Sequence, residues 1–354
     1  MNSPITKKER LQYFDLLKGV AIFVVVMGHI ITMCIRDIDS AFIFKMISEI
    51  HMPMFFFISG YLTYKSSFTR PNIWKRFKQL IIPFFIVSAL WIWYYPHSYL
   101  LSPISSTLDG LYHSYWKDGY WFTLTLFEIF IVYYPLSIIL SKIKNAIVQI
   151  IISVGVYIAL IILAHFVSFP LENNDLIGAG LLASFFPIFM MGIFAHRYSD
   201  TFKTMINSNG WFLIAIVCII PSWYYLSYSW ELPMLPEFTR LIALPLEHFG
   251  LIIIALTIII PWSNKEYSGN APKPSPVARY FTLLGKESLS IYLLHYFFLF
   301  PLTILQEPMR GMGLSFVPLL VVSVIVAFIV IAVTLFVNYI IQRNSTLSFL
   351  LIGK

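Results

Sequence analysis

Long apolar segments follow one another along almost the whole chain, and this pattern constrains the fold more than any other feature. A helix rises about 1.5 Å per residue, so about 20 apolar residues cross the hydrocarbon of a bilayer. We therefore predict an all-α, polytopic integral membrane protein that forms one transmembrane domain over residues 1–354, with about ten transmembrane helices. The predicted spans are 13–35, 48–65, 79–96, 119–140, 146–168, 176–196, 211–229, 240–262, 280–305 and 316–342.

The composition supports this interpretation. Hydrophobic residues make up 58% of the 354 residues and charged residues only 12%, against roughly 25% charged residues in ordinary soluble domains. A soluble protein of this length has too small a core to bury so much apolar surface. The net charge of +7 does not indicate a nucleic-acid partner, because the basic residues lie in short loops and form no nucleic-acid-binding motif.

The distribution of Lys and Arg predicts the orientation of the chain. With ten crossings and an inner N-terminus, 19 of the 24 basic residues fall on the inner side. Short cytoplasmic loops of membrane proteins are enriched in Lys and Arg. We therefore predict a multi-pass protein of the bacterial inner membrane with both termini in the cytoplasm. The five outer basic residues are Arg36, Lys45, Lys117, Arg240 and Arg310.

Ionisable side chains inside apolar spans are costly, so each is a candidate functional residue. We interpret Glu247 and His248 as structural, because a membrane histidine often only hydrogen-bonds a neighbouring helix. The two cysteines, Cys34 and Cys218, stand alone, and no spacing predicts a metal site. The candidates chosen within the predicted spans are Asp15, Lys18, His29, His51, Glu128, Glu247, His248 and His295.

Five ordered motifs resemble the membrane acyltransferase-3 family, in particular its standalone sugar O-acetylase type, similar to fucose 4-O-acetylase-like members. In that family a basic residue, ten further residues and a histidine lie on the first helix, and Lys18 and His29 have this spacing. Arg is commoner at the basic position, and Lys fits a sub-branch that includes sugar O-acetylases. The motifs occupy 13–29, 51–61, 76–83, 120–124 and 284–295.

The resemblance implies an enzyme that transfers an acetyl group from cytoplasmic acetyl-CoA to a hydroxyl of a glycan or lipid-linked sugar, without a metal. His29 would act as general base or carry the acetyl group covalently, and Glu128 would orient its ring. Lys18 and Arg76 would bind the phosphates of acetyl-CoA. The residues expected to bind substrate or support the site are Asp15, His51, Ser59, Tyr292 and His295.

The spacing of Lys18 and His29 is compatible with one bound donor. Eleven residues span roughly 17 Å and about three turns, which puts both side chains on nearly one face. The basic cluster around Arg76 also has a simpler interpretation, as a topology signal that contacts anionic lipids.

The sequence is also compatible with a transport function. A transporter or flippase for lipid-linked glycans would have the same composition and would also carry intramembrane His and Glu residues. A purely structural membrane protein would not explain the buried histidines. The predicted partners are the bilayer and a sugar acceptor, and a homo-oligomer is left open.

Overall fold

The computed structural model describes residues 12–32, 38–65, 68, 70–98, 119–168, 178–228, 237–267, 273–299, 302 and 316–354. Among these residues every regular element is a helix, which confirms the all-α prediction. The elements are α1 (Gln12–Ile30), α2 (Ile38–Thr63), α3 (Ile73–Arg76), η2 (Phe77–Ile81), α4 (Ile82–Ser98), α6 (Trp121–Lys142), α7 (Ala146–Ser168), α8 (Ala179–Arg197), α9 (Ser199–Ile206), α10 (Asn209–Tyr228), α11 (Glu237–Tyr267), α12 (Pro276–Lys286), α13 (Ser288–Leu294), α14 (Tyr296–Leu299), α16 (Phe316–Ile341) and α17 (Ser345–Ile352).

The helices have the length and hydropathy of a multi-pass membrane protein. Within the described part of the chain, seven helices are long and apolar enough to cross a membrane, and the sharply bent pair α9 and α10 brings the number to eight. The count of ten stays a prediction. The most hydrophobic stretches of α7 and α16 are only 17% and 28% buried by protein, so most of their apolar surface is left to face lipid.

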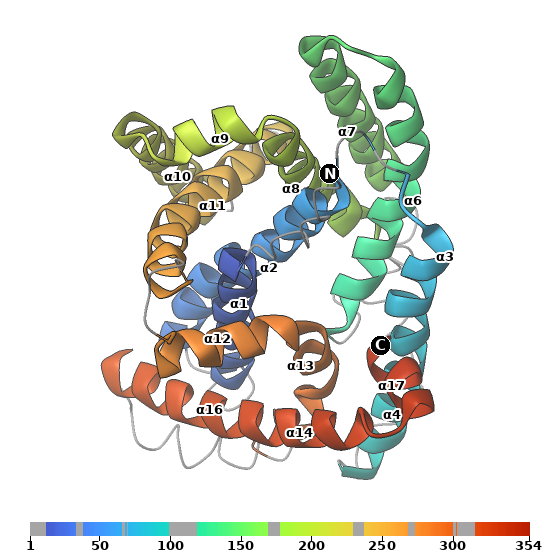
Figure 1. Ribbon diagram of the computed structural model, residues 1–354, viewed down its shortest axis with the longest axis vertical. Coiled ribbons are helices and arrows are strands. Elements are labelled where there is room, and N and C mark those ends of the chain that lie inside the picture. Colours follow the sequence, from blue (N-terminus) through green and yellow to red (C-terminus); the bar gives the residue numbers. More distant parts are fainter. Residues whose placement is uncertain are drawn as a thin grey trace, which may run out of the picture.

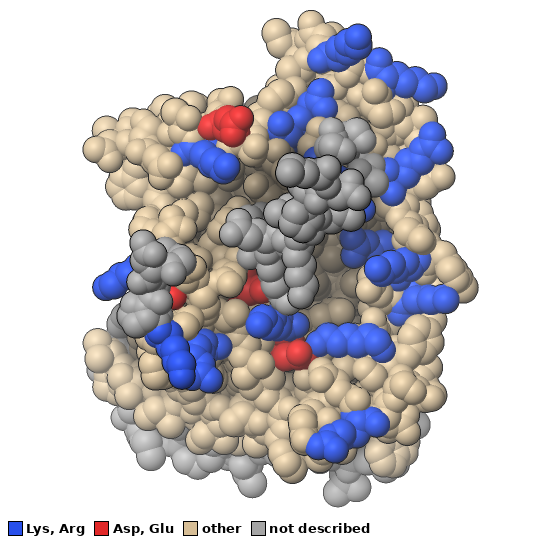
Figure 2. Space-filling view, in the orientation of Figure 1, with Lys and Arg blue, Asp and Glu red and all other residues tan. Residues whose placement is uncertain are grey.

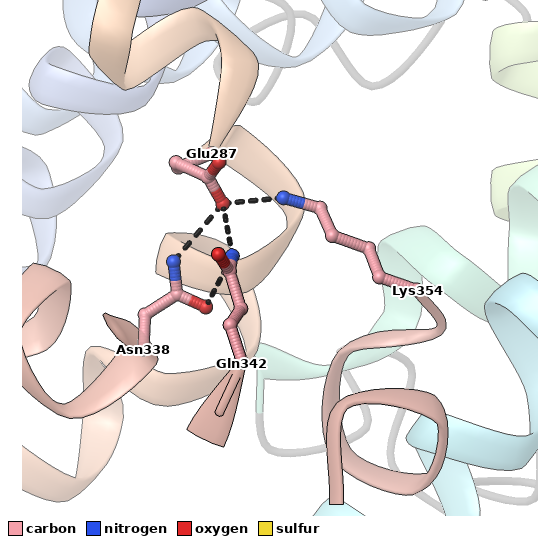
Figure 3. A network of polar contacts seen from close by, with 4 residues as sticks. All are labelled: Glu287, Asn338, Gln342 and Lys354. Carbon is pink, nitrogen blue, oxygen red and sulfur yellow. Dashed lines mark hydrogen bonds and ion pairs between the residues drawn. The ribbon is translucent and has the colours of Figure 1, made fainter. Parts of the chain in front are cut away.

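Residues 276–299 differ from the single span predicted at 280–305, because they form three short helices, α12, α13 and α14. The first break falls at Glu287, which separates α12 from α13. Its carboxylate accepts hydrogen bonds from the Asn338 amide of α16 at 3.0 Å and from the amide of Gln342, just after α16, at 2.9 Å, and forms an ion pair with Lys354 (Figure 3). These three contacts fix Glu287 to the C-terminal part of the chain and so hold the break between α12 and α13 in place.

Predicted span 48–65 also differs, since α2 begins about ten residues earlier, at Ile38, and continues through Pro53. Helix α2 packs tightly against α8 through two glycines. A Cβ atom on Gly60 would overlap the carbonyl oxygen of Phe189, and one on Gly192 would overlap that of Phe57. Small residues of this kind allow helix backbones to approach closely within membranes.

Helix α1 lies near the centre of the molecule, with α12 across it and α16 along the lower edge of the view (Figure 1). The crossing of α1 and α12 depends on one glycine from each helix. A Cβ atom on Gly19 would overlap the carbonyl oxygen of Phe281, and one on Gly285 would overlap that of Asp15. The two backbones therefore touch, and α1 and α12 form one packed unit.

The face that carries α12, α13 and α17 is strongly basic. Figure 2 shows many Lys and Arg side chains on this face and few Asp or Glu side chains. This is the distribution that the sequence predicts for the inner face.

Candidate active site

Three histidines that are far apart in the sequence gather at one place in the fold. His29 lies near the end of α1, His51 lies on α2, and His295 lies between α13 and α14. The ring centroids of His29 and His295 are 5.4 Å apart. His51 is buried and lies within range of an electrostatic interaction with His29. The structure thus brings together three of the ionisable residues predicted to form the site.

The tautomer of His295 can be inferred from its partners. Its Nδ1 atom lies 2.9 Å from the carbonyl oxygen of Ile291 and 2.8 Å from that of Tyr292. Carbonyl oxygens only accept hydrogen bonds, so the proton of the neutral ring belongs on Nδ1. Nε2 then carries the lone pair, and it is buried without a hydrogen-bond partner among the described residues. A buried basic nitrogen therefore lies beside His29.

Tyr296 is the direct partner of His29 and was not predicted from the sequence. Its hydroxyl oxygen lies 2.9 Å from His29 Nε2, and its ring centroid lies 4.3 Å from that of His295. The rings of Trp91 and Tyr120 pack against it, with centroids 5.9 and 5.4 Å away. Tyr296 therefore contacts both histidines and is held from its other sides by aromatic packing.

Gly119 provides the room that the Tyr296 hydroxyl occupies. Its φ angle is +94°, in the region that favours glycine, and a Cβ atom there would overlap the Tyr296 hydroxyl. The hydroxyl of Tyr292 donates to the Gly119 carbonyl at 2.6 Å and accepts from the backbone N–H of Phe122 at 3.1 Å. Tyr292 thus ties α13 to the start of α6 and fixes Gly119 beside Tyr296.

Glu128 and Ser59 make contacts with residues outside the histidine cluster. Glu128 Oε2 lies on α6 near Gly178, where an added Cβ would be 3.8 Å away, and Ser59 accepts a hydrogen bond from Thr63 through its carbonyl at 2.6 Å. The Tyr296 hydroxyl is a partner of the His29 ring, at 2.9 Å from Nε2. The roles predicted for Glu128 and Ser59 stay predictions.

The two predicted phosphate contacts lie on different helices. Lys18 Nζ forms an ion pair with Asp15 Oδ1 at 3.0 Å near the start of α1. Arg76 is half-buried on α3, with its guanidinium 4.5 Å from the ring centroid of Phe130. The π-helix η2 follows directly, and such segments are frequent at functional sites. Helices α3 and α12 lie on different sides of the view, with α1 near α12 (Figure 1).

No group of three or more His, Cys, Asp or Glu residues within the described segments has the arrangement of a metal site. The site contains imidazole and phenol groups, which can donate and accept hydrogen bonds and can take up or release a proton during a reaction. This chemistry suits the transfer of a group to a hydroxyl.

Comparison with known proteins supports this chemistry. A family model described as "Acyltransferase domain" matches residues 11–340. Nodulation protein NolL of Mesorhizobium japonicum is 34% identical over 33% of this chain and 34% of its own length. NolL of Sinorhizobium fredii is 40% identical over 22% of the chain and 23% of its own length.

The chain thus spans about a third or less of the length of these curated relatives. No solved structure gives a significant match. The family match covers nearly the whole chain, from the helix α1 that carries His29 to the long helix α16, and includes every residue of the histidine cluster. The protein is a member of the acyltransferase-3 family of membrane proteins.

Proposed function

We propose that the protein transfers an acetyl group from acetyl-CoA to a hydroxyl of a glycan or lipid-linked sugar at the bacterial inner membrane. The observation that carries this proposal is the cluster of His29, His295 and Tyr296 inside an apolar helical bundle. The basic face in Figure 2 would be the cytoplasmic face, which meets the donor.

In the proposed step, His29 donates its Nε2 proton in a hydrogen bond to the Tyr296 oxygen, which leaves the lone pair on Nδ1. Nδ1 takes the proton of the sugar hydroxyl as its oxygen bonds to the thioester carbon. The Tyr296 hydroxyl donates to the thioester oxygen, where negative charge develops. The carbon–sulfur bond then breaks, and the proton passes from His29 to the departing thiolate to give free CoA.

The other predicted residues keep supporting roles in this proposal. Lys18 and Arg76 would contact donor phosphates, and the Arg76 guanidinium makes no ion pair within the described residues. Asp15 fixes Lys18 through their ion pair. His51 would tune the charge of His29, and Glu128 and Ser59 would contact the acceptor.

The test of this function is transfer of radiolabel. Membranes from cells that express the chain are incubated with acetyl-CoA labelled in its acetyl group, and lipid-linked glycans are extracted and counted. We expect label in the extract above that from membranes without the protein. A glycan transporter without acyl chemistry leaves no covalent label, so an extract without excess label would contradict the proposal.

Replacing Tyr296 with phenylalanine should lower kcat about 100-fold and leave the KM for acetyl-CoA unchanged. The variant keeps the aromatic packing but loses both the hydrogen bond to His29 and the donor to the thioester oxygen, and loss of one such donor has an effect of about this size. Initial rates at several donor concentrations give both constants. Tyr134→Phe on the exposed side of α6 is the matched control, and an equal loss in both variants would argue against a role for Tyr296.

A further inference from the structure

A cavity of about 270 Å³ opens between the first turn of α1, the end of α11 and one face of α12. It lies outside the histidine cluster, at the opposite end of α1 from His29. Its lining residues are Gln12, Asp15, Tyr267, Arg279, Thr282, Leu283 and Lys286.

Two unpaired cations line this cavity. Arg279 and Lys286 are seven residues apart on α12, about two helical turns, and therefore lie on one face. Neither makes a hydrogen bond or ion pair through its side chain with any residue that the structure describes. Both side chains belong to exposed residues, so an incoming ligand can reach them.

The carboxylates on the cavity wall, or next in sequence to its residues, are already occupied. Asp15 is paired with Lys18 at 3.0 Å. Glu287 is paired with Lys354 and with the side-chain amides of Asn338 and Gln342. Glu266 accepts hydrogen bonds from the Ser275 backbone N–H at 2.7 Å and from Trp262 Nε1 at 3.4 Å. The cavity therefore presents positive charge that the protein itself does not neutralise.

The hydroxyl groups of the wall are also occupied. The Tyr267 hydroxyl donates its proton to the Ala278 carbonyl at 3.2 Å. The Thr282 hydroxyl lies 2.6 Å from the Tyr267 oxygen and therefore donates to it. These bonds tie the end of α11 to α12 and give the cavity a fixed wall. Arg279 and Lys286 are left as its main polar contacts for a ligand, and both favour phosphate groups.

The position along α1 constrains the shape of such a ligand. Asp15 and His29 are 14 residues apart, roughly 21 Å along the helix axis. A molecule with phosphates in the cavity and its reacting carbon at His29 must be long and thin between these ends. An acyl-CoA has this form, since its pantetheine arm separates the phosphorylated nucleotide from the thioester.

We propose that Arg279 and Lys286 bind the phosphate-bearing nucleotide end of the acyl donor in this cavity. The proposal rests on the proposed function, and it assigns the main phosphate contacts to α12, whereas Lys18 is paired with Asp15 of the cavity wall. Phosphate headgroups of anionic lipids share the same chemistry, so the experiment must separate these two sources.

The test measures binding of CoA and of phosphate-free acetyl-pantetheine to the purified protein in nanodiscs of neutral lipid. For Arg279→Ala/Lys286→Ala we expect at least about tenfold weaker binding of CoA and unchanged binding of acetyl-pantetheine. Lys142→Ala at the end of α6 removes an exposed cation elsewhere and should leave both affinities unchanged. Elution volume and Tm confirm that each variant is folded.

The outcomes are distinguishable. Unchanged CoA affinity in the folded double variant would overturn this assignment and leave the proposed function intact. A second measurement compares the Tm of each protein in nanodiscs with and without anionic lipid. If the double variant lost a Tm increase that anionic lipid gives the unaltered protein, but kept its CoA affinity, the cavity would be a lipid headgroup site and the assignment to the acyl donor would be overturned. Failure of the unaltered protein to bind either CoA or acetyl-pantetheine would instead contradict the proposed function.

Discussion

Replacing His29 with alanine is expected to lower acetyl transfer about 100- to 10,000-fold, the range typical of a lost general base. The expectation rests on the contacts of this side chain. Its Nε2 atom is held by the Tyr296 hydroxyl at 2.9 Å, and its ring lies 5.4 Å from that of His295. The measurement is the initial rate of label transfer at saturating acetyl-CoA in membranes that contain equal amounts of protein.

The matched control is His165→Ala, because His165 is an exposed histidine on α7. It should transfer acetyl groups at the rate of the unaltered protein. Transfer by the His29 variant at more than about a tenth of that rate would show that His29 is not the base. His295, with its buried Nε2 lone pair, would then be the next histidine to substitute.

Replacing Gly119 with alanine is expected to lower kcat about 100-fold, because small displacements of reacting groups have effects of this size. The added Cβ would overlap the Tyr296 hydroxyl and force it away from His29. Alanine also disfavours the φ angle of +94°, so we expect a fall in Tm as well. Rates and thermal unfolding of the purified protein provide both readouts.

Gly155→Ala is the control for this variant, since nothing lies within 4 Å of the position that its Cβ would take. It should keep full activity and the same or a higher Tm, because alanine favours helices more than glycine does. Comparison with Tyr296→Phe separates the effect of displacing the Tyr296 hydroxyl from the effect of backbone strain at residue 119. If Gly119→Ala were as active as the unaltered protein, the contact between Gly119 and Tyr296 would not matter for catalysis.

The sequence alone allowed prediction of the histidines, because an ionisable residue within an apolar span is conspicuous. His29, His51 and His295 could be chosen for this reason, and the structure brings them together. Tyr296 could not be chosen in the same way, since aromatic residues make up 18% of this chain. Its role depends on a contact with a residue 267 positions away.

The remaining differences also depend on tertiary contacts. The apolar pattern continues past Glu287, so the break between α12 and α13 becomes visible only with its partners Asn338, Gln342 and Lys354. Arg279 and Lys286 look like ordinary inner-face charges in the sequence. Which cations remain unpaired depends on the neighbouring carboxylates, and a linear pattern of charge does not contain that information.

The glycine contacts between α1 and α12 have a further consequence for movement. In the proposed reaction a donor enters from one side of the membrane and an acceptor arrives within it, and we expect some helices to shift between these two events. Backbones in direct contact at Gly19 and Gly285 cannot slide or rotate past one another without a clash. We therefore expect α1 and α12 to move as one rigid unit, so that any opening or closing takes place between this pair and the helices around it.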